Sequence, residues 1–327
     1  MRPALQATYL LPIKADNEAA AVQVAAYLNE LRAGVAEIVV VDGSADAFFA
    51  RLRTLLQPSI RHLRPDERYR SMLNGKVRGV LTGLDVASFD RVVIADDDVR
   101  YNWVSLERVV SLLADADVVR PQNVFSELPW HARLDYARTC LNRVFGGDWP
   151  GTLAVRRSAL VASPWYDGNV LFENLEMVRT VAAAGGRIKR LDDVFVVRRP
   201  PTVRHYASQR VRQAYDEFAR PGYLLAELSL LPLAMTAIRR FGASALVPLA
   251  CIPMLVAEAG RRKAGAVSVF DARSSLCAPV WVAERACTIW LALAARLLGG
   301  IPYAGSRLKR AANSPAALRR RIRQNAA

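Results

Sequence analysis

The chain has 327 residues, of which 52% are hydrophobic, and it carries a formal net charge of +15. The charge is uneven, because residues 239–327 hold 15 Lys+Arg and only 3 Asp+Glu, a net charge of +12. Basic residues beside apolar stretches favour an anionic membrane surface over nucleic acid, and no zinc-finger or RNA-binding signature accompanies the charge. This length accommodates one large domain or two smaller ones.

The four cysteines, Cys140, Cys251, Cys277 and Cys287, show no Cys-x-x-Cys spacing and sit mostly in apolar contexts. We therefore expect reduced, buried thiols and a reducing compartment. The first apolar run, Ala7–Ile13, is too short for a signal peptide, so we expect the N-terminal domain in the cytoplasm.

The beginning of the chain alternates predicted strands and helices. Ala7–Ile13 suits a strand, and Asp16 and Asn17 then offer an N-cap for an alanine-rich helix that Gly34 ends. Glu37–Val41 predicts a second strand. This alternation is typical of a mostly parallel sheet wound with helices.

The second predicted strand runs directly into Asp42, Gly43 and Ser44. At the carboxyl end of a strand in an α/β sheet, a carboxylate can touch a ligand, and glycine permits close approach. The alternative is an ordinary left-handed turn. Ala45–Leu56 is then predicted as a helix and Ile60–Arg64 as an edge strand.

A helix spaced by glycines, Asn74–Leu84, precedes the most polar part of the domain. Lys76 or Arg78 in this helix can reach a diphosphate, or either side chain can simply be solvated. Trp103–Ala114 is predicted as a later helix and Asp117–Arg120 as the strand that follows it.

Three adjacent carboxylates, Asp96, Asp97 and Asp98, follow the apolar strand Val92–Ala95. They repel one another and cannot be buried dry, so they need a compensating cation. Hard oxygen ligands select Mg²⁺ or Mn²⁺, and Mg²⁺ typically uses one or two carboxylates plus substrate phosphates. The alternative is a solvated acidic turn that caps the next helix.

Two later stretches carry further candidate site residues. Gly146–Arg157 is a glycine-rich loop that enters a strand, and its Trp149 can line an acceptor site or simply pack. Phe172–Gly186 is a predicted helix with Glu173 and Glu176 in its first turn. Acidic residues at that place also complement the helix dipole without any catalytic role.

The composition becomes apolar from Leu224 onward. Leu224–Ile238 and Ala243–Ala257 are apolar runs of 15 residues each, shorter than the ~20 residues that a straight membrane-spanning helix needs. Val280–Leu298 mixes charged residues with two tryptophans, as an interfacial helix does. Basic clusters around these runs favour the cytoplasmic side of a membrane. The alternative is a set of core helices packed on the N-terminal domain.

Taken in order, residues 7–212 resemble a family 2 glycosyltransferase with the GT-A nucleotide-diphospho-sugar transferase fold. Residues 11–18 are similar to that family's opening strand and Asn-Glu turn, and residues 39–44 to its second strand. Asp96-Asp97-Asp98 stands where the family has Asp-x-Asp.

The resemblance implies an α/β fold, a Rossmann-like and mostly parallel sheet with helices on both faces. We expect a nucleotide-sugar-binding catalytic domain in residues 1–221, an apolar helical membrane-associated region in 222–305 and a basic tail in 306–327. The resemblance implies that Asp42 contacts the nucleobase, that Asp96 lies near the ribose and that Asp98 binds the metal with Asp96. The residues expected around the donor are Pro12, Asn17, Glu18, Asp42, Lys76, Asp96, Gln209 and Arg212.

The catalytic base departs from the family pattern. The family's Glu-Asp pair falls at Glu173-Asn174, and an asparagine cannot take a proton at neutral pH. Glu173 is therefore the expected base, with Glu176 and Asp167 as further candidates.

A second motif departs in one position. Gln209 and Arg212 match two positions of the Gln-x-x-Arg-Trp motif of membrane-bound members, including the ceramide glucosyltransferase-like branch, while Gln213 replaces the tryptophan.

The function expected from these residues is transfer of a sugar from a nucleotide-diphospho-sugar to a lipid or glycan hydroxyl. It would use Mg²⁺ or Mn²⁺, proceed with inversion and take place on the cytoplasmic face of a cell-envelope membrane. One alternative is a catalytically silent, membrane-anchored nucleotide-sugar-binding protein, which Asn174 makes conceivable. Another is a sugar nucleotidyltransferase, which is disfavoured because the glycine-rich basic signature for triphosphates is missing.

Overall fold

The structure is a computed structural model, and it describes residues 3–15, 17–161 and 166–326. The strands are β1 (Leu5–Ile13), β2 (Val35–Asp42), β3 (Arg61–Leu63), β4 (Arg91–Ala95), β5 (Val99–Arg100), β6 (Val118–Phe125), β7 (Thr152–Arg156), β8 (Ile188–Arg198), β9 (Ile301–Tyr303) and β10 (Ser306–Leu308). The α-helices are α1 (Glu18–Leu31), α2 (Asp46–Leu55), α3 (Gly75–Val86), α4 (Trp103–Ser111), α5 (Trp130–Val144), α6 (Arg157–Val161), α7 (Glu173–Ala183), α8 (Val203–Tyr215), α9 (Pro221–Phe241), α10 (Leu246–Arg262), α11 (Ala272–Leu276), α12 (Ala278–Leu297) and α13 (Pro315–Ala326).

The chain folds into two compact units that alternate along the sequence. The first unit comprises Met1–Pro121, Pro150–Leu191 and Asn313–Ala327, and the second comprises Gln122–Trp149 and Asp192–Ala312. The first unit therefore draws on both ends of the sequence. The division into residues 1–221, 222–305 and 306–327 separates the chain by expected function, and it stays a prediction.

Among the described residues, an eight-stranded sheet has the order β3-β2-β1-β4-β7-β6-β8-β5. β1 pairs in parallel with β2 and β4, and β2 pairs in parallel with the edge strand β3. β7 runs antiparallel to both β4 and β6, so the sheet is mixed. The expected mostly parallel sheet is confirmed, and the reversed direction of β7 places Thr152, its first residue, beside Ala95, the last residue of β4.

Helices cover both faces of the sheet in the first unit, as predicted. Successive residues of a strand point to opposite faces, so apolar residues on both sides of β1 need a helix on each side. Tyr9 packs edge-on against Tyr27 of α1, with ring centroids 6.1 Å apart. Leu10 faces α3, where a Cβ added to Gly83 would lie 2.0 Å from the Leu10 Cδ1 atom.

The start of α1 is set by its cap. The Asn17 side chain accepts a hydrogen bond from the Ala20 backbone N–H at 3.0 Å, as expected for an N-cap. Asp16, the other candidate for this position, lies outside the described residues.

Glycines let α3 lie close to β1, which fixes where the helix begins. Gly79 and Gly83 are four residues apart and lie on one face of the helix. A Cβ added to Gly79 would come 2.8 Å from the Pro12 Cβ atom. The side chain of Asn74 caps the helix by accepting hydrogen bonds from the backbone N–H groups of Lys76 and Val77. The first turn of α3 is thereby held beside the carboxyl end of β1.

The second unit is mainly helical and includes α5, a helix that the sequence patterns did not predict. Arg143 of α5 is fully buried. Its guanidinium donates to the carbonyl oxygens of Gly260 at 3.1 Å and Lys263 at 2.6 Å, at the C-terminal end of α10. A cation is favourable at that end of a helix, and the bonds fix α5 against α10.

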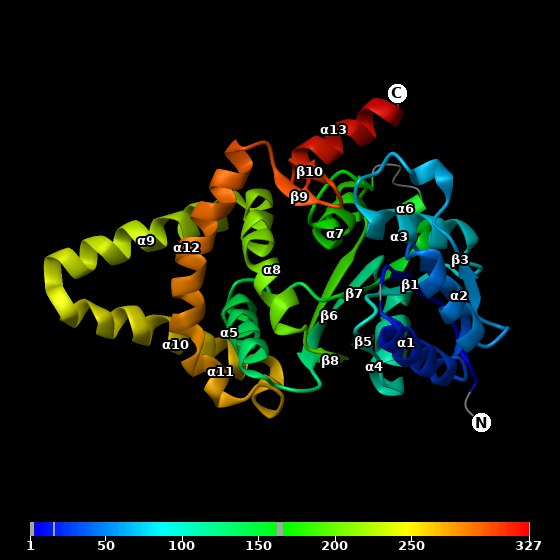
Figure 1. The fold of residues 1–327 in the computed structure, drawn as a ribbon, viewed down its shortest axis with the longest axis horizontal. Helices are drawn as coiled ribbons and strands as arrows, with labels where there is room; N and C mark the ends of the chain where they lie inside the picture. The colour runs from blue at the N-terminus through cyan, green and yellow to red at the C-terminus, as the bar shows by residue number, and fades with distance from the viewer. Residues whose placement is uncertain (1–2, 16, 162–165, 327) are drawn as a thin grey trace. The chain divides into compact units, whose positions relative to one another are not determined.

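The two predicted apolar runs form α9 and α10 of the second unit. Figure 1 shows these helices (yellow) running out from α12 and meeting in a turn. Within the described residues, Pro221–Ser268 and Ala278–Leu297 are long and apolar enough to cross a membrane, and 11% and 39% of their most apolar windows are buried. On α9 and α10, called the two arms below, several large apolar side chains are more than half exposed: Leu225, Leu233, Phe241, Leu246, Val247, Ile252 and Leu255.

The cysteines only partly match the expectation of buried thiols. Cys140 in α5 is buried and Cys277 is partly buried, whereas Cys251 of α10 and Cys287 of α12 are exposed. Apolar neighbours in sequence do not bury these two cysteines, because each points away from the packed side of its helix.

Candidate active site

Lys76, Asp96 and Glu173 meet at the carboxyl end of the parallel strands. The Lys76 Nζ atom lies 2.6 Å from Asp96 Oδ1 and 3.0 Å from Glu173 Oε1. The side chains of Lys76, Asp96 and Glu173 are 19%, 24% and 15% exposed, so they are largely shielded from water but can still be reached by a ligand. They come from the first turn of α3, the residue after β4 and the first residue of α7. The structure thus brings together three residues that were singled out separately.

Asp96 and Glu173 keep the Lys76 side chain protonated and positively charged. Burial lowers the pKa of Lys76, but Asp96 and Glu173 outweigh that effect and raise the pKa above its usual 10.5. The stabilisation from this pairing is therefore fully present below pH 10.5 and is lost only as pH rises through the higher folded value. An ammonium carries three donors, and a third, longer contact of 3.5 Å reaches Asn174 Oδ1.

Asn174 has a structural role at this place. Its Nδ2 atom donates to the Pro150 carbonyl oxygen at 2.9 Å, and the residue is 8% exposed. The amide cannot accept a proton at neutral pH, whereas the neighbouring Glu173 carboxylate can. The group suited to acid–base chemistry at the start of α7 is therefore Glu173.

The loop before β7 passes directly over Asp96. The Asp96 backbone N–H donates to the Gly151 carbonyl oxygen at 2.8 Å, and a Cβ added to Gly151 would lie 2.6 Å from Asp96 Oδ2. A side chain at position 151 would therefore push the Asp96 carboxylate out of this position. Gly151 is a site residue to which the sequence patterns gave no role beyond membership of a glycine-rich loop.

Asp96 and Asp98 fit a divalent cation that completes its coordination with substrate. Both are partly buried carboxylates on the turn after β4, and hard oxygen donors suit Mg²⁺ and Mn²⁺. Within residues 3–15, 17–161 and 166–326, no group of three or more His, Cys, Asp or Glu side chains is arranged to hold a metal. A two-carboxylate set is nevertheless the usual protein share for Mg²⁺ bound together with phosphates.

Asp42 lies at the carboxyl end of β2 and is fully buried. Its Oδ2 atom is 3.1 Å from His62 Nε2, and its Oδ1 atom accepts the Ser44 backbone N–H at 2.8 Å. Burial raises the pKa of Asp42, but the bonds from His62 and Ser44 outweigh it and hold the pKa below 3.8. Asp42 is therefore a fixed anion, and His62 is a partner that the sequence patterns missed.

A layered group of side chains stands beside this pair. The Phe49 ring stacks on His62 with centroids 4.0 Å apart, and Arg64 Cζ lies 4.0 Å from the centre of the same ring. Two groups cannot stack on one face of a ring, so Phe49 lies between them. Arg64 also donates to the Ser44 carbonyl oxygen and, at 2.5 Å, to Asp46 Oδ1. The turn after β2 is thereby held rigid.

The remaining predicted donor residues have structural contacts of their own. Pro12 packs against α3, and Asn17 caps α1. Glu18 is exposed and pairs with Arg51 at 3.0 Å, and both line a pocket of about 270 Å³.

Gln209 and Arg212 lie on α8 in the second unit. Gln209 is partly buried, with a 3.4 Å contact to Ser208 Oγ, and Arg212 lies over the Tyr303 ring at 4.9 Å. The buried member of this stretch is Arg210, which pairs with Asp135 at 3.1 Å.

A second polar cluster lies on α7 behind Glu173. Glu176 is fully buried and accepts two hydrogen bonds of 2.7 Å from the backbone N–H and the Nδ2 atom of Asn313. Asn313 Nδ2 also donates to Asp167 Oδ2 at 3.0 Å. Helix α13 follows Asn313 and packs on α7 (Figure 1), with Leu318 fully buried. Residues 313–326, expected as a basic tail, are therefore part of the first unit.

This cluster bears on the other candidates for a base. Burial raises the pKa of Glu176, and the bonds from Asn313 oppose that rise. Because both carboxylate oxygens of Glu176 are already bonded to Asn313, Glu176 is held away from solvent. Glu173 is the more accessible of the two glutamates.

No family model matches the chain, and no curated protein matches it. Among solved structures, the chain is similar to glucosyl-3-phosphoglycerate synthase from Mycobacterium tuberculosis in complex with Mn²⁺, UDP and glucosyl-3-phosphoglycerate. That similarity has 20% identity over 62% of this chain and 75% of that chain, with a TM-score of 0.44. The chain is also similar to a mannosyltransferase from Pyrobaculum calidifontis in complex with GDP-Man and Mn²⁺, at 19% identity over 87% of each chain and a TM-score of 0.49. Both similarities are low, so the chemistry of this chain has to be taken from its own residues.

Proposed function

We propose that this protein is a glycosyltransferase that moves a sugar from a nucleotide-diphospho-sugar to an acceptor hydroxyl. The observation that carries the proposal is the meeting of Lys76, Asp96 and Glu173 at the carboxyl ends of parallel strands. In open α/β sheets, ligands bind at that edge. A cation, an accessible acid–base group and a carboxylate suited to a metal are the groups that transfer from a diphosphate leaving group requires.

Each residue has a role in this reaction. Lys76 contacts the diphosphate. Asp42 is fully buried with both carboxylate oxygens bonded to His62 and Ser44, so its part in nucleobase binding would be indirect, by holding the turn after β2 in place. Mg²⁺ or Mn²⁺ held by Asp96 and Asp98 would supply stabilisation of charge on the leaving diphosphate. Glu173 accepts the proton of the acceptor hydroxyl as that oxygen attacks the anomeric carbon, with inversion of configuration.

The test is a turnover assay with full-length protein in detergent and Mn²⁺. A panel of UDP-, GDP- and dTDP-sugars is supplied alone and with a membrane lipid extract, and release of nucleoside diphosphate is measured. We expect one donor to be consumed, and the Glu173→Gln variant to consume it far more slowly. No consumption of any donor would refute the proposal.

One observation favours a second candidate, a silent nucleotide-sugar-binding protein. Asn174 stands where the resembled family has its base, and its amide is already committed to the Pro150 carbonyl oxygen. This candidate predicts that a nucleotide-sugar binds with Mn²⁺ in calorimetry while no donor is consumed with any acceptor. Turnover by the wild-type protein would eliminate it.

We further propose that α9 and α10 enter the cytoplasmic face of a membrane, and that the acceptor is a lipid or lipid-linked sugar. The support is the exposed apolar surface of α9 and α10 together with the exposed basic residues Arg239, Arg240 and Arg262 at their C-terminal ends. An apolar surface of this extent is costly in water and favourable in lipid, and cations favour anionic headgroups.

Cell fractionation tests this placement. Leu233→Asp with Leu255→Asp puts two charges on apolar arms, at a cost of about 3 kcal/mol each near a bilayer centre. We expect this double variant to move from the membrane fraction to the soluble one. Val22→Asp with Val104→Asp, at exposed apolar positions of the first unit, is the matched control and should stay with the membrane. A wild-type protein that is soluble without detergent or high salt would refute the membrane proposal.

A further inference from the structure

The ammonium of Lys76 lies against one of the two carboxylates assigned to the metal. It is 2.6 Å from Asp96 Oδ1 and 3.0 Å from Glu173 Oε1, distances of charge-assisted hydrogen bonds. The fold therefore supplies a cation of its own to the cluster of carboxylates at the end of β4.

A divalent cation and this ammonium compete for the same place. Both are positive, both are attracted by Asp96, and like charges a few ångströms apart repel each other. The backbone of Lys76 is fixed, because its N–H donates to Asn74 Oδ1 at 3.1 Å, but its four-carbon side chain can turn. A nearby diphosphate would offer the ammonium other anionic oxygens.

We propose that Lys76 is a built-in competitor that couples metal binding to nucleotide binding. Without nucleotide, the ammonium holds Asp96 and keeps the affinity for a divalent cation low. When a nucleoside diphosphate binds, the ammonium exchanges Asp96 for phosphate oxygens, and Asp96 becomes a metal ligand. Metal and nucleotide then favour each other's binding by the same factor, as linkage requires.

The proposal rests on the proposed function and adds the order of assembly of that same site. Lys76 acts here through Asp96, so its part in metal binding is that of a positioning residue. The same ammonium holds the Glu173 carboxylate at 3.0 Å, so its exchange also frees the base when the donor arrives.

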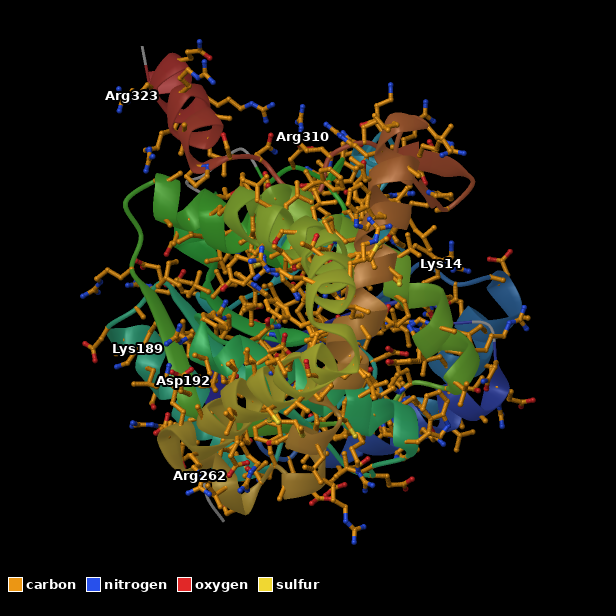
Figure 2. All side chains as sticks on the ribbon, turned by 90° about the vertical axis from the view of Figure 1, so that its left-hand side faces the viewer. Lys14, Lys189, Asp192, Arg262, Arg310 and Arg323 are labelled. Carbon is orange, nitrogen blue, oxygen red and sulfur yellow. The ribbon has the colours of Figure 1, made fainter. Side chains whose placement is uncertain are left out.

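The experiment is calorimetric titration of full-length protein with Mn²⁺ alone, and then with Mn²⁺ in the presence of UDP, GDP or dTDP. Lys76→Met removes the charge and keeps the length, whereas Lys76→Arg keeps the charge. Lys189→Met is the matched control, because it removes an equal charge from an exposed lysine that Figure 2 shows on the surface.

We expect Lys76→Met to bind Mn²⁺ alone about tenfold more tightly than wild type, and to gain less from added nucleotide. Lys76→Arg and Lys189→Met should both resemble wild type. Lys76→Gln is a second neutral variant with the same expected result, and melting temperatures measured in parallel show which variants fold.

Two results separate the inference from the function beneath it. If nucleotide strengthens Mn²⁺ binding in wild type but neither neutral variant binds Mn²⁺ alone more tightly, the competition is overturned and the proposed function stands. If none of the three nucleotides changes Mn²⁺ binding in wild type, the proposed metal-dependent nucleotide site is overturned, and the coupling falls with it.

Discussion

Replacing Asn313 by alanine tests the contact that ties residues 313–326 to α7. Asn313 is 4% exposed and donates three hydrogen bonds, two to Glu176 and one to Asp167. Alanine keeps the backbone N–H bond to Glu176 Oε2 but removes both bonds of the side-chain amide. The variant therefore leaves a buried carboxylate with one donor fewer.

The expected loss is about 3 kcal/mol of unfolding free energy. A hydrogen bond to a charged group contributes roughly 1.5–3 kcal/mol, and Glu176, being fully buried, feels the whole loss. The Asp167 side chain is 15% exposed and lies 3.9 Å from Arg321, so water and that arginine offset part of the second lost bond. For a unit of this size, about 3 kcal/mol lowers the melting temperature by roughly 6–12 °C.

The effect should depend on pH in a defined direction. Burial raises the pKa of Glu176 and the bonds from Asn313 lower it, so removing the amide raises the pKa further. A group whose folded pKa is raised contributes stability below its unfolded pKa, here 4.5, and loses it as pH rises through the folded value. The difference in unfolding free energy between wild type and Asn313→Ala should therefore be largest at neutral pH and should become smaller as the pH falls.

Thermal melting of full-length protein at pH 7 and pH 5 measures both effects. Asn29→Ala is the matched control, because Asn29 bonds only to neutral backbone groups of Leu55 and Gln57, at 2.9 and 3.0 Å. Asn29→Ala should lower the melting temperature by less than Asn313→Ala, and by the same amount at pH 7 and at pH 5. An Asn313→Ala variant that melts within about 1 °C of wild type, or one no worse than Asn29→Ala, would refute the reasoning.

Three further substitutions test the site. Asp98→Asn keeps size but removes charge, so calorimetry should show nucleotide-sugar binding that no longer responds to Mn²⁺; an unchanged metal response would contradict the assignment of Asp98. Glu173→Gln should lower turnover roughly 10²–10⁴-fold with donor binding kept, and near-normal turnover would make another carboxylate the base. His62→Ala should cost about 1.5–3 kcal/mol, because it leaves Asp42 buried without its partner. His62 and Ser44 hold the pKa of Asp42 below 3.8 against the effect of burial, so the wild-type protein loses unfolding free energy as the pH falls through the pKa of Asp42. The His62→Ala variant should lose less over the same pH range. Urea unfolding at pH 6 and pH 3 measures this difference.

The regular elements of the first unit could be predicted because their sequence signals are local. Buried parallel strands are continuous apolar runs, and β1, β2 and β4 follow such runs. Helix α5 gave no such signal, because buried polar residues on its inner face, among them Asp135 and Arg143, interrupt the apolar periodicity. Those side chains are buried because they bond to other parts of the second unit, which no local pattern reveals.

Some residues of the candidate site could likewise be predicted from local sequence signals, and others could not. Asp42 and Asp96 could be singled out because each directly follows a predicted strand, and Glu173 because it begins a helix. The partners of Asp42 and of the neighbouring Glu176 could not be singled out, since His62 comes from the edge strand and Asn313 is 137 positions from the Glu176 that it bonds. Contacts across such separations depend on the packed fold. Gln209 and Arg212 matched a motif by spacing, and whether they serve the donor stays a prediction.

The place of Asn313 in the first unit has a consequence for how the protein is made. Glu176 leaves the ribosome 137 residues before Asn313, which at 5–20 residues per second is roughly 7–27 s earlier. During that interval α9, α10 and α12 are synthesised, while α7 lacks the partner that satisfies its buried carboxylate. The first unit can therefore close only after the apolar helices of the second unit have emerged. A protein ending near Pro221 would lack that closing segment and would be a poor stand-in for the first unit.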